Sequence, residues 1–156
     1  MFQSPMAGCT DLAFRLIARE HGLELAFTEM ISAEALIRDH QKTFDLLRRA
    51  KGDFPTACQL VGHSAEAMGK ASGIVESLGF KLLDINCGCP VRKVTGQEAG
   101  AALLKDPKRA GDIFRAVMRG IKKIPVTAKM RAGYHDPSGK EAVRLARLAE
   151  DSGLAF

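Results

Sequence analysis

The loop at residues 86–94, Asn-Cys-Gly-Cys-Pro-Val-Arg-Lys-Val, is the strongest local chemical feature of the sequence. Glycine and proline on either side of Cys89 fix a tight backbone that can present its thiol to a cleft. An ordinary cysteine thiol is mostly protonated at neutral pH, so it can donate a proton. An inert loop cysteine and an activated thiolate nucleophile are competing interpretations of the same residues. A nucleophile would need a partner base, and no histidine is adjacent to this loop in the sequence.

The cysteines do not have the spacing of a closed zinc site, so we expect no metal centre. Cys87 and Cys89 are separated by one residue, whereas closed sites use paired C-x2-C or H-x3-H motifs. The other candidate ligands lie far away in the sequence, at Cys9, Cys58 and His63. The first residues show neither a basic nor an apolar segment typical of secretion, and no apolar run is long enough to span a membrane. We therefore expect reduced thiols, a cytoplasmic location and no membrane association.

The composition is that of a soluble globular protein and excludes a disordered or collagen-like chain, with 46% hydrophobic and 26% charged residues. Lysine and arginine number 23 against 18 acidic residues, which gives a formal net charge of +5. This balance suits an anionic partner such as nucleic acid or a phosphorylated cofactor. It fits a mildly basic surface equally well, so charge alone does not decide the function.

Helix signals alternate with short apolar runs, which predicts a parallel α/β sheet built from βαβ units. Strands are expected to begin near residues 1, 24, 56, 81 and 125, with a further start at Leu154. Helices are expected after N-caps at Thr10–Asp11, Ser64 and Asp106, and after a Ser138–Glu141 capping box. Residues 32–51 are predicted to form one or two further helices.

Two architectures fit this alternation, namely an open doubly wound sheet and part of a (β/α)8 TIM barrel. A full barrel has about 250 residues, so the second interpretation requires that the chain of 156 residues be incomplete. An ending on the start of a new strand favours the barrel. We therefore predict an α/β fold that is an incomplete TIM barrel, with about the first five β/α units.

In both architectures ligands lie beyond the carboxyl-terminal ends of the strands, so the residues that follow each strand form the candidate site. These residues are Pro5, Met6, Ala7 and Gly8 after the first strand, Glu29 after the second, Gln59 in the third, residues 86–89 after the fourth, and Lys129 and Arg131 after the fifth. Their convergence predicts a polar ligand site. We interpret Glu29 as a structural hydrogen-bonding residue rather than as a ligand.

Six motifs in this order resemble the tRNA-dihydrouridine synthase family, whose members are flavin-dependent enzymes with a barrel followed by a helical domain. They are SPMAGCTDLAFR, TEM, QLVG, DINCGCPVRKV, AGAALLKDP and PVTAKMRAGY. The resemblance implies that residues 1–156 are the N-terminal portion of an FMN-binding barrel. The C-terminal barrel strands, the phosphate-binding loops and a helical RNA-binding domain would lie beyond Phe156. We therefore expect the 156 residues alone to bind FMN weakly and to be inactive.

The resemblance also assigns roles to matching positions. Cys89 matches the catalytic acid, whereas Cys87 occupies a variable position. The implied cofactor-binding residues are Pro5, Met6 and Ala7 along the flavin ring, Gln59 at its polar edge and Lys129 at its pyrimidine end. The implied substrate-binding residues are Asn86, Lys93 and Arg131. The implied reaction is the reduction of uridines in tRNA to 5,6-dihydrouridine, with FMN as cofactor, NADPH as reductant and Cys89 as proton donor.

Two other functions stay open. A flavin-dependent dehydrogenase of free pyrimidines, similar to dihydroorotate or dihydropyrimidine dehydrogenase, would share the chemistry, although Arg92-Lys93 beside the acid loop favours the tRNA enzymes. A non-catalytic RNA-binding fragment is the alternative from a different class. We interpret the remaining cations near the predicted helix at 106–120 as a solvated face, namely Lys105, Lys108, Arg109, Arg115, Arg119, Lys122 and Lys123.

Overall fold

A computed structural model describes residues 1–155 of the chain as a parallel α/β structure. Within these residues the sheet has four strands in the order β1-β2-β3-β4, and all three pairings are parallel. The strands are β1 (Ala26–Ser32), β2 (Thr56–Val61), β3 (Leu82–Cys87) and β4 (Val126–Met130). The prediction of a parallel α/β fold is therefore confirmed, with strand starts within two residues of those expected.

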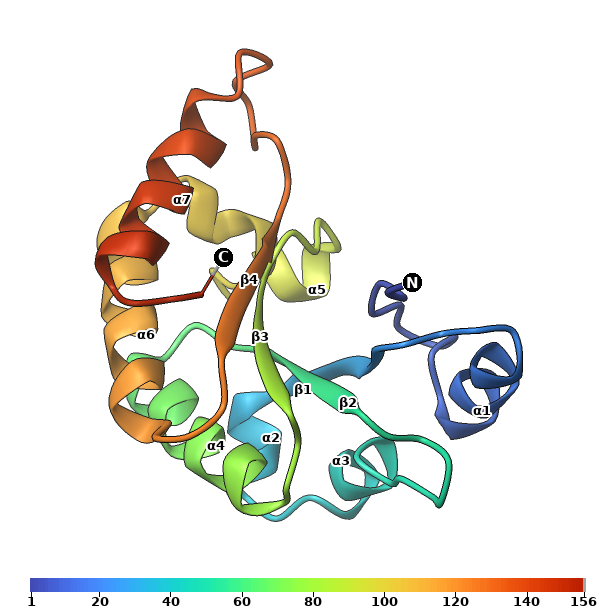
Figure 1. Cartoon of the computed structure of the whole chain (residues 1–156). Coiled ribbons are helices and arrows are strands. Elements are labelled where there is room, and N and C mark those ends of the chain that lie inside the picture. The colour runs from blue at the N-terminus through green and yellow to red at the C-terminus, as the bar shows by residue number, and fades with distance from the viewer. Residues whose placement is uncertain (156) are drawn as a thin grey trace.

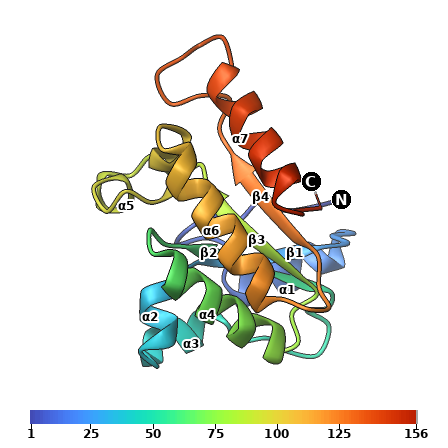
Figure 2. The same ribbon diagram turned by 90° about the vertical axis from the view of Figure 1, so that its left-hand side faces the viewer.

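Helices connect the strands. They are α1 (Leu12–Glu20), α2 (Ala33–Ile37), α3 (Gln41–Leu46), α4 (Ala65–Ser77), α5 (Arg92–Thr95), the 3-10 helix η1 (Gly100–Leu104), α6 (Pro107–Gly120) and α7 (Lys140–Asp151). Figure 1 shows the strands fanned across the centre, and Figure 2 shows that α4, α6 and α7 lie together on one side of the sheet. The opposite side, which we call the inner face, carries no such layer within residues 1–155 (Figure 1).

Three of the predicted helix starts are confirmed by their caps. The side chains of Asp11, Ser64 and Asp106 accept hydrogen bonds from the backbone N–H groups three residues later. The predicted Ser138–Glu141 capping box is wrong, because α7 follows Gly139 and the Ser138 hydroxyl donates instead to Asp136. Glu141 reaches back further and accepts from the N–H groups of residues 134–136, so it fixes the β4–α7 loop rather than the cap.

The core lies between the helix layer and the side of the sheet that faces it. Leu60, Ile85 and other alternate strand residues pack there against α4 and α6. The two helices approach closely because Gly120 faces the backbone of Gly69, where a side chain on Gly120 would collide. The backbones of α4 and α6 therefore pack in direct contact within the helix layer.

The two ends of the described chain differ from the strands expected there. Phe2 forms an isolated parallel bridge with Leu25, and the side-chain oxygen of Gln3 accepts from the N–H of Phe27, so residues 1–4 contact the sheet without forming a strand. The N–H of Ala155 donates to the carbonyl of Val126 in β4 at 2.8 Å. Continuation of the strand expected from Leu154 lies outside the described residues. The predicted loop after β3 also contains two short helices, α5 and the buried η1, which sequence periodicity did not reveal.

Candidate active site

A cavity of about 200 Å³ opens at the carboxyl-terminal edge of the sheet on its inner face. It is lined by the strand residues Met30, Gln59, Asn86 and Lys129, by the loop residues Gly88, Cys89 and Val91, and by Pro5 and Ala7 from the N-terminal segment. The strand register explains this grouping, because Met30 pairs with Gln59 and Asn86 pairs with Lys129. Neighbours in register point to the same side of a parallel sheet.

A buried chain of hydrogen bonds crosses three strands beneath the cavity. Thr127 Oγ1 donates to Asp84 Oδ1 at 2.6 Å, and Gln59 Nε2 donates to Asp84 Oδ2 at 2.6 Å. Asn86 Nδ2 then donates to Gln59 Oε1 at 2.8 Å. Because Asp84 and Asn86 hold both ends of the Gln59 amide, the orientation of this amide is fixed.

The amide of Gln59 keeps one N–H for a ligand. Its carbonyl oxygen accepts from Asn86 and one N–H donates to Asp84, while the second N–H has no acceptor among residues 1–155. Burial raises the pKa of Asp84 above its ordinary range. The hydrogen bonds from Gln59 and Thr127 and the positive charge of Lys129 lower this pKa, but by less than burial raises it. The cluster therefore presents an amide donor and an ammonium group to the same cavity.

Asn86 also sets the course of the cysteine loop. Its side-chain oxygen accepts from the N–H groups of Gly88 at 3.1 Å and Cys89 at 2.9 Å. Such a side-chain to backbone pair replaces the next strand hydrogen bonds and turns the chain out of β3. The turn places the half-buried Cys89 in the wall of the cavity.

Cys87 has the opposite environment. It is the last residue of β3, is fully buried and belongs to the core between the sheet and the helices. Burial, with a smaller effect from the charge of Asp84, raises the pKa of the Cys87 thiol far above its ordinary range. A thiol of this kind is protonated and inert.

The N-terminal segment is tied to the sheet and to α1 before it reaches the cavity. Glu29 accepts from the N–H of Gly8 at 2.5 Å, which confirms the structural role expected of Glu29. Arg15 donates to the carbonyl of Thr10 at 2.9 Å and forms a fully buried ion pair with Asp53 at 2.8 Å. These contacts hold the turn that carries Pro5 and Ala7.

The structure brings six of the nine predicted site residues together around one cavity. They are Pro5, Ala7, Gln59, Asn86, Cys89 and Lys129. Met6 lies in the same segment but is 43% exposed and is absent from the cavity wall formed by the described residues. Lys93 lines an adjacent hollow with Glu34 and Val94, and the stem of Arg131 lies beside Gly88.

Sequence reasoning missed Asp84 and Thr127 as members of the site. Both lie inside apolar strand segments, where the sequence alone does not distinguish a polar site residue from a polar residue of the core. The usable signal was spacing, because Asp84 stands two residues before Asn86 and Thr127 two residues before Lys129. Strand residues separated by two lie on one face.

Within residues 1–155 the structure contains no group of three or more histidine, cysteine, aspartate or glutamate side chains placed to hold a metal ion. None of the helices described is long and apolar enough to cross a bilayer.

The cavity offers an amide, a thiol, an ammonium group and apolar walls. This set can hold the polar edge of a flat heterocycle and donate a proton to it.

Comparisons with a family model and with curated proteins agree on one family. A family model described as "Dihydrouridine synthase (Dus)" matches residues 2–156. The chain is 38% identical over 152 residues to a probable tRNA-dihydrouridine synthase of Rickettsia conorii, covering 97% of this chain and 45% of that protein. It is 41% identical over 163 residues to one from Treponema pallidum, covering 100% of this chain and 48% of that protein.

A third relative is tRNA-dihydrouridine synthase B of Shewanella oneidensis. It is 36% identical over 152 residues, which cover 97% of this chain and 47% of the relative. The chain therefore spans about half the length of the curated relatives it matches.

Proposed function

Because the chain belongs to the dihydrouridine synthase family, we propose that it is the N-terminal part of a tRNA-dihydrouridine synthase. The reaction is the reduction of uridines in tRNA to 5,6-dihydrouridine, with FMN as cofactor and NADPH as reductant. The observation that carries this proposal is the placement of Cys89, whose backbone Asn86 fixes in the wall of a cavity shared with Gln59 and Lys129.

The residues of the cavity fit the polar end of a flavin ring. Pro5 and Ala7 supply apolar wall, with Met6 in the same segment, and Gln59 supplies the N–H that the network leaves over. Lys129 supplies a positive charge, which stabilises negative charge on a bound ring. A cavity of about 200 Å³ is smaller than the roughly 300–1,000 Å³ of complete ligand sites. It therefore suits one end of the cofactor, and we propose that the remaining barrel holds the phosphate.

Cys89 acts as the general acid in this proposal. FMN held by Gln59, Lys129 and the Pro5–Ala7 segment, and reduced by NADPH, would supply a hydride for C6 of the uracil ring. The Cys89 thiol gives its proton to C5 and then regains one from solvent, so the C5–C6 double bond becomes saturated. A positioned acid of this kind contributes roughly 10²- to 10⁴-fold to the rate. Asn86 maintains the geometry by holding the N–H of Cys89.

The substrate-binding roles divide between the cavity and its surroundings. Asn86 lies at the cavity and is assigned to the reacting nucleotide. Lys93 and Arg131 are exposed and lie outside the wall that the described residues form, which suits contacts with the RNA backbone. The reacting uridine must leave its stack to enter the site, because its ring cannot reach a flavin inside folded RNA.

The fold supports a barrel as the complete architecture. The four parallel strands in sequential order, the Phe2–Leu25 bridge before them and the Ala155–Val126 hydrogen bond after them follow the progression of a TIM barrel in the residues described. We propose that residues 1–156 form about the first five β/α units. The remaining strands and a helical RNA-binding domain would complete a cytoplasmic enzyme.

The test compares Cys89→Ala with Cys87→Ala in the full-length protein, using unmodified tRNA transcript, FMN and NADPH. Dihydrouridine formation should fall by about 10²- to 10⁴-fold in Cys89→Ala and stay near the wild-type rate in Cys87→Ala. Mass spectrometry of the RNA gives the measurement. A large loss only in Cys87→Ala would reverse the assignment of the acid. Reduction of free uracil or orotate in preference to tRNA would replace the proposal with a free-pyrimidine dehydrogenase.

A further inference from the structure

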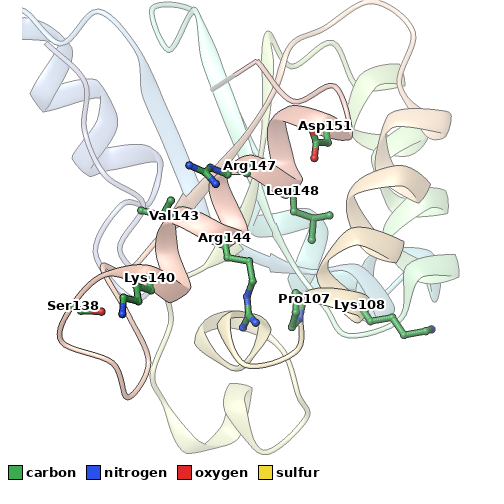
Figure 3. Close-up of a pocket in the computed structure, with 9 residues that line it drawn as sticks. All are labelled: Pro107, Lys108, Ser138, Lys140, Val143, Arg144, Arg147, Leu148 and Asp151. Carbon is green, nitrogen blue, oxygen red and sulfur yellow. The ribbon is translucent and has the colours of Figure 1, made fainter.

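A second hollow, which we call the α6–α7 groove, lies on the outer side of the molecule away from the cavity. It has a volume of about 710 Å³ and is open to solvent. Its lining residues are Pro107 and Lys108 from α6, Ser138 from the loop, and Lys140, Val143, Arg144, Arg147, Leu148 and Asp151 from α7 (Figure 3). The apolar part of the lining packs the helices together, since Leu148 contacts the position of Gly111 in α6.

The groove is strongly positive, because its described lining holds four cationic side chains and a single carboxylate. Cations of α6 are paired with acidic neighbours, and Lys108 of the groove lining pairs with Asp112 at 3.3 Å. Arg109 pairs with Asp106 and Glu98, and Arg115 pairs with Asp112. In contrast, Lys140, Arg144 and Arg147 of α7 have no ion-pair partner among residues 1–155.

The cations are arranged along the helix rather than scattered. Lys140 and Arg144 are four residues apart, which places them on one face of α7 about 6 Å apart along its axis. In Figure 3 the side chain of Arg144 points into the space between α7 and the start of α6. Lys108 belongs to the α6 wall, but its side chain is 90% exposed and points away from α7 in Figure 3, so the free cations of the groove come from α7.

The position of the groove relates it to the candidate active site. Helices α6 and α7 follow β3 and β4 in the chain, so both begin at the carboxyl-terminal edge of the sheet, where the cavity also opens. Pro107 and Lys140 are the first residues of the two helices, and helix N-termini carry partial positive charge. A polyanion that reaches the cavity can therefore continue over this edge into the groove.

We propose that the α6–α7 groove binds the sugar–phosphate backbone of the RNA substrate at a site separate from the cavity. This proposal rests on the proposed function, because it takes tRNA as the substrate. The occupant is assigned by charge complementarity: unpaired lysine and arginine side chains in a wide, open hollow suit phosphates, whose binding releases counterions. The contacts fix the orientation of the RNA and take no part in the chemistry.

The experiment measures the binding of unmodified tRNA transcript to the full-length protein over a series of salt concentrations. Lys140→Gln/Arg144→Gln should weaken binding by about tenfold near 0.1 M salt and lower the slope of log K against log[salt] by about 1.5. The matched control, Lys122→Gln/Lys123→Gln, removes the same charge at the far end of α6. Its affinity should change by less than about twofold if the groove is the site.

A charge-preserving variant separates electrostatics from folding. Lys140→Arg/Arg144→Lys should bind tRNA with the wild-type salt slope. Equal losses in the groove and control variants, or no loss in the groove variant, would overturn the proposal. Polyglutamate that displaces labelled tRNA as effectively as unlabelled tRNA does, at equal charge, would also overturn the proposal. The groove would then be a site for acidic protein.

The outcome is distinguishable from failure of the proposed function. Dihydrouridine formation by the wild-type protein and by the control Lys122→Gln/Lys123→Gln tests the proposed reaction separately, since both proteins keep the cavity and the groove. If the wild-type protein forms no dihydrouridine, the proposed reaction is wrong, while the binding slopes still report on the groove. If dihydrouridine forms but the slopes of both variants match wild type, the groove assignment alone fails.

Discussion

The two faces of the sheet carry different residues although they come from the same strands. The face toward the helices holds Cys58, Leu60 and Ile85 in the packed core. The inner face holds Gln59 and Asp84 in the hydrogen-bonded cluster. Consecutive residues therefore serve packing and chemistry in turn, as the alternation of a strand requires. A substitution on the face toward the helices should therefore change stability, and a substitution at the next residue, on the inner face, should change the site.

The two cysteines at the end of β3 and in the loop after it, Cys87 and Cys89, show where this alternation stops. Cys87 and Cys89 are two residues apart and would share a face if β3 continued. The strand ends at Cys87, and the side chain of Asn86 binds the next two N–H groups, so the chain turns toward the cavity. A single asparagine thus separates an inert core thiol from one that a ligand can reach.

Thiol labelling of the native protein gives the largest expected difference between the two environments. At pH 8 the exposed Cys9 and the half-buried Cys89 should react faster than Cys58 and Cys87 by a factor on the order of 10³ or more. Burial raises the pKa of Cys58 to about 12 and that of Cys87 further, so both are almost entirely protonated as well as inaccessible. Mass spectrometry of timed samples identifies each site. Labelling of Cys87 as fast as Cys89 would contradict the assignment of faces.

Truncation of side chains on the two faces should give the next largest difference. Ile85→Ala removes fully buried atoms from the helix side and should lower the free energy of unfolding by about 2–5 kcal/mol. Thr127→Val keeps the side-chain shape but removes one donor to Asp84 and should cost about 1–3 kcal/mol.

Urea denaturation measures both unfolding free energies, and Ile85→Val, which should cost about 0.5–1.5 kcal/mol, controls for chain packing. The rate of dihydrouridine formation by the full-length protein should distinguish the two faces. Thr127→Val should slow it, because loss of the Thr127–Asp84 hydrogen bond loosens the Gln59 amide. Ile85→Val should leave it near the wild-type rate, because the cavity lining stays in place. Slower dihydrouridine formation in Ile85→Val than in Thr127→Val would contradict the assignment of packing and chemistry to different faces of the sheet.

The sequence predicted the alternation of elements well because its signals are local. The caps at Asp11, Ser64 and Asp106 bind groups three residues away, so residue type and spacing determine them. The error at Ser138 has the same origin. The capping motif is present there, but Glu141 forms hydrogen bonds within the β4–α7 loop, which only the folded chain brings together.

The site was predictable in part because topology places strand ends at one edge. Gln59, Asn86, Cys89 and Lys129 were found in this way and by family resemblance. Lys93 and Arg131 lie outside the cavity that residues 1–155 form, and their assignment to the RNA stays a prediction. Asp84 was missed because its partners, Gln59 and Thr127, come from separate strands and become neighbours only through register.

The smallest expected effect concerns the pH dependence of stability, and it isolates Asp84 on the inner face. Because burial raises its pKa above the ordinary value of 3.8, the folded protein holds this proton to higher pH than the unfolded chain does. Stability from Asp84 therefore falls as pH rises from the ordinary value through the raised one. Carboxylates with lowered pKa, such as Glu76 and Asp106, act in the opposite direction.

Comparison of Asp84→Asn with the wild type cancels those other carboxylates, since both proteins contain them. The variant cannot titrate at this position, so its stability relative to the wild type should rise as pH increases from about 4 and then level off above the raised pKa. Urea denaturation at successive pH values gives the difference. A relative stability of the variant that falls with rising pH would mean that Asp84 is stabilised as a carboxylate. The hydrogen bonds from Gln59 and Thr127 would then outweigh its burial, and the inner face would be an anion-stabilising site rather than a costly one.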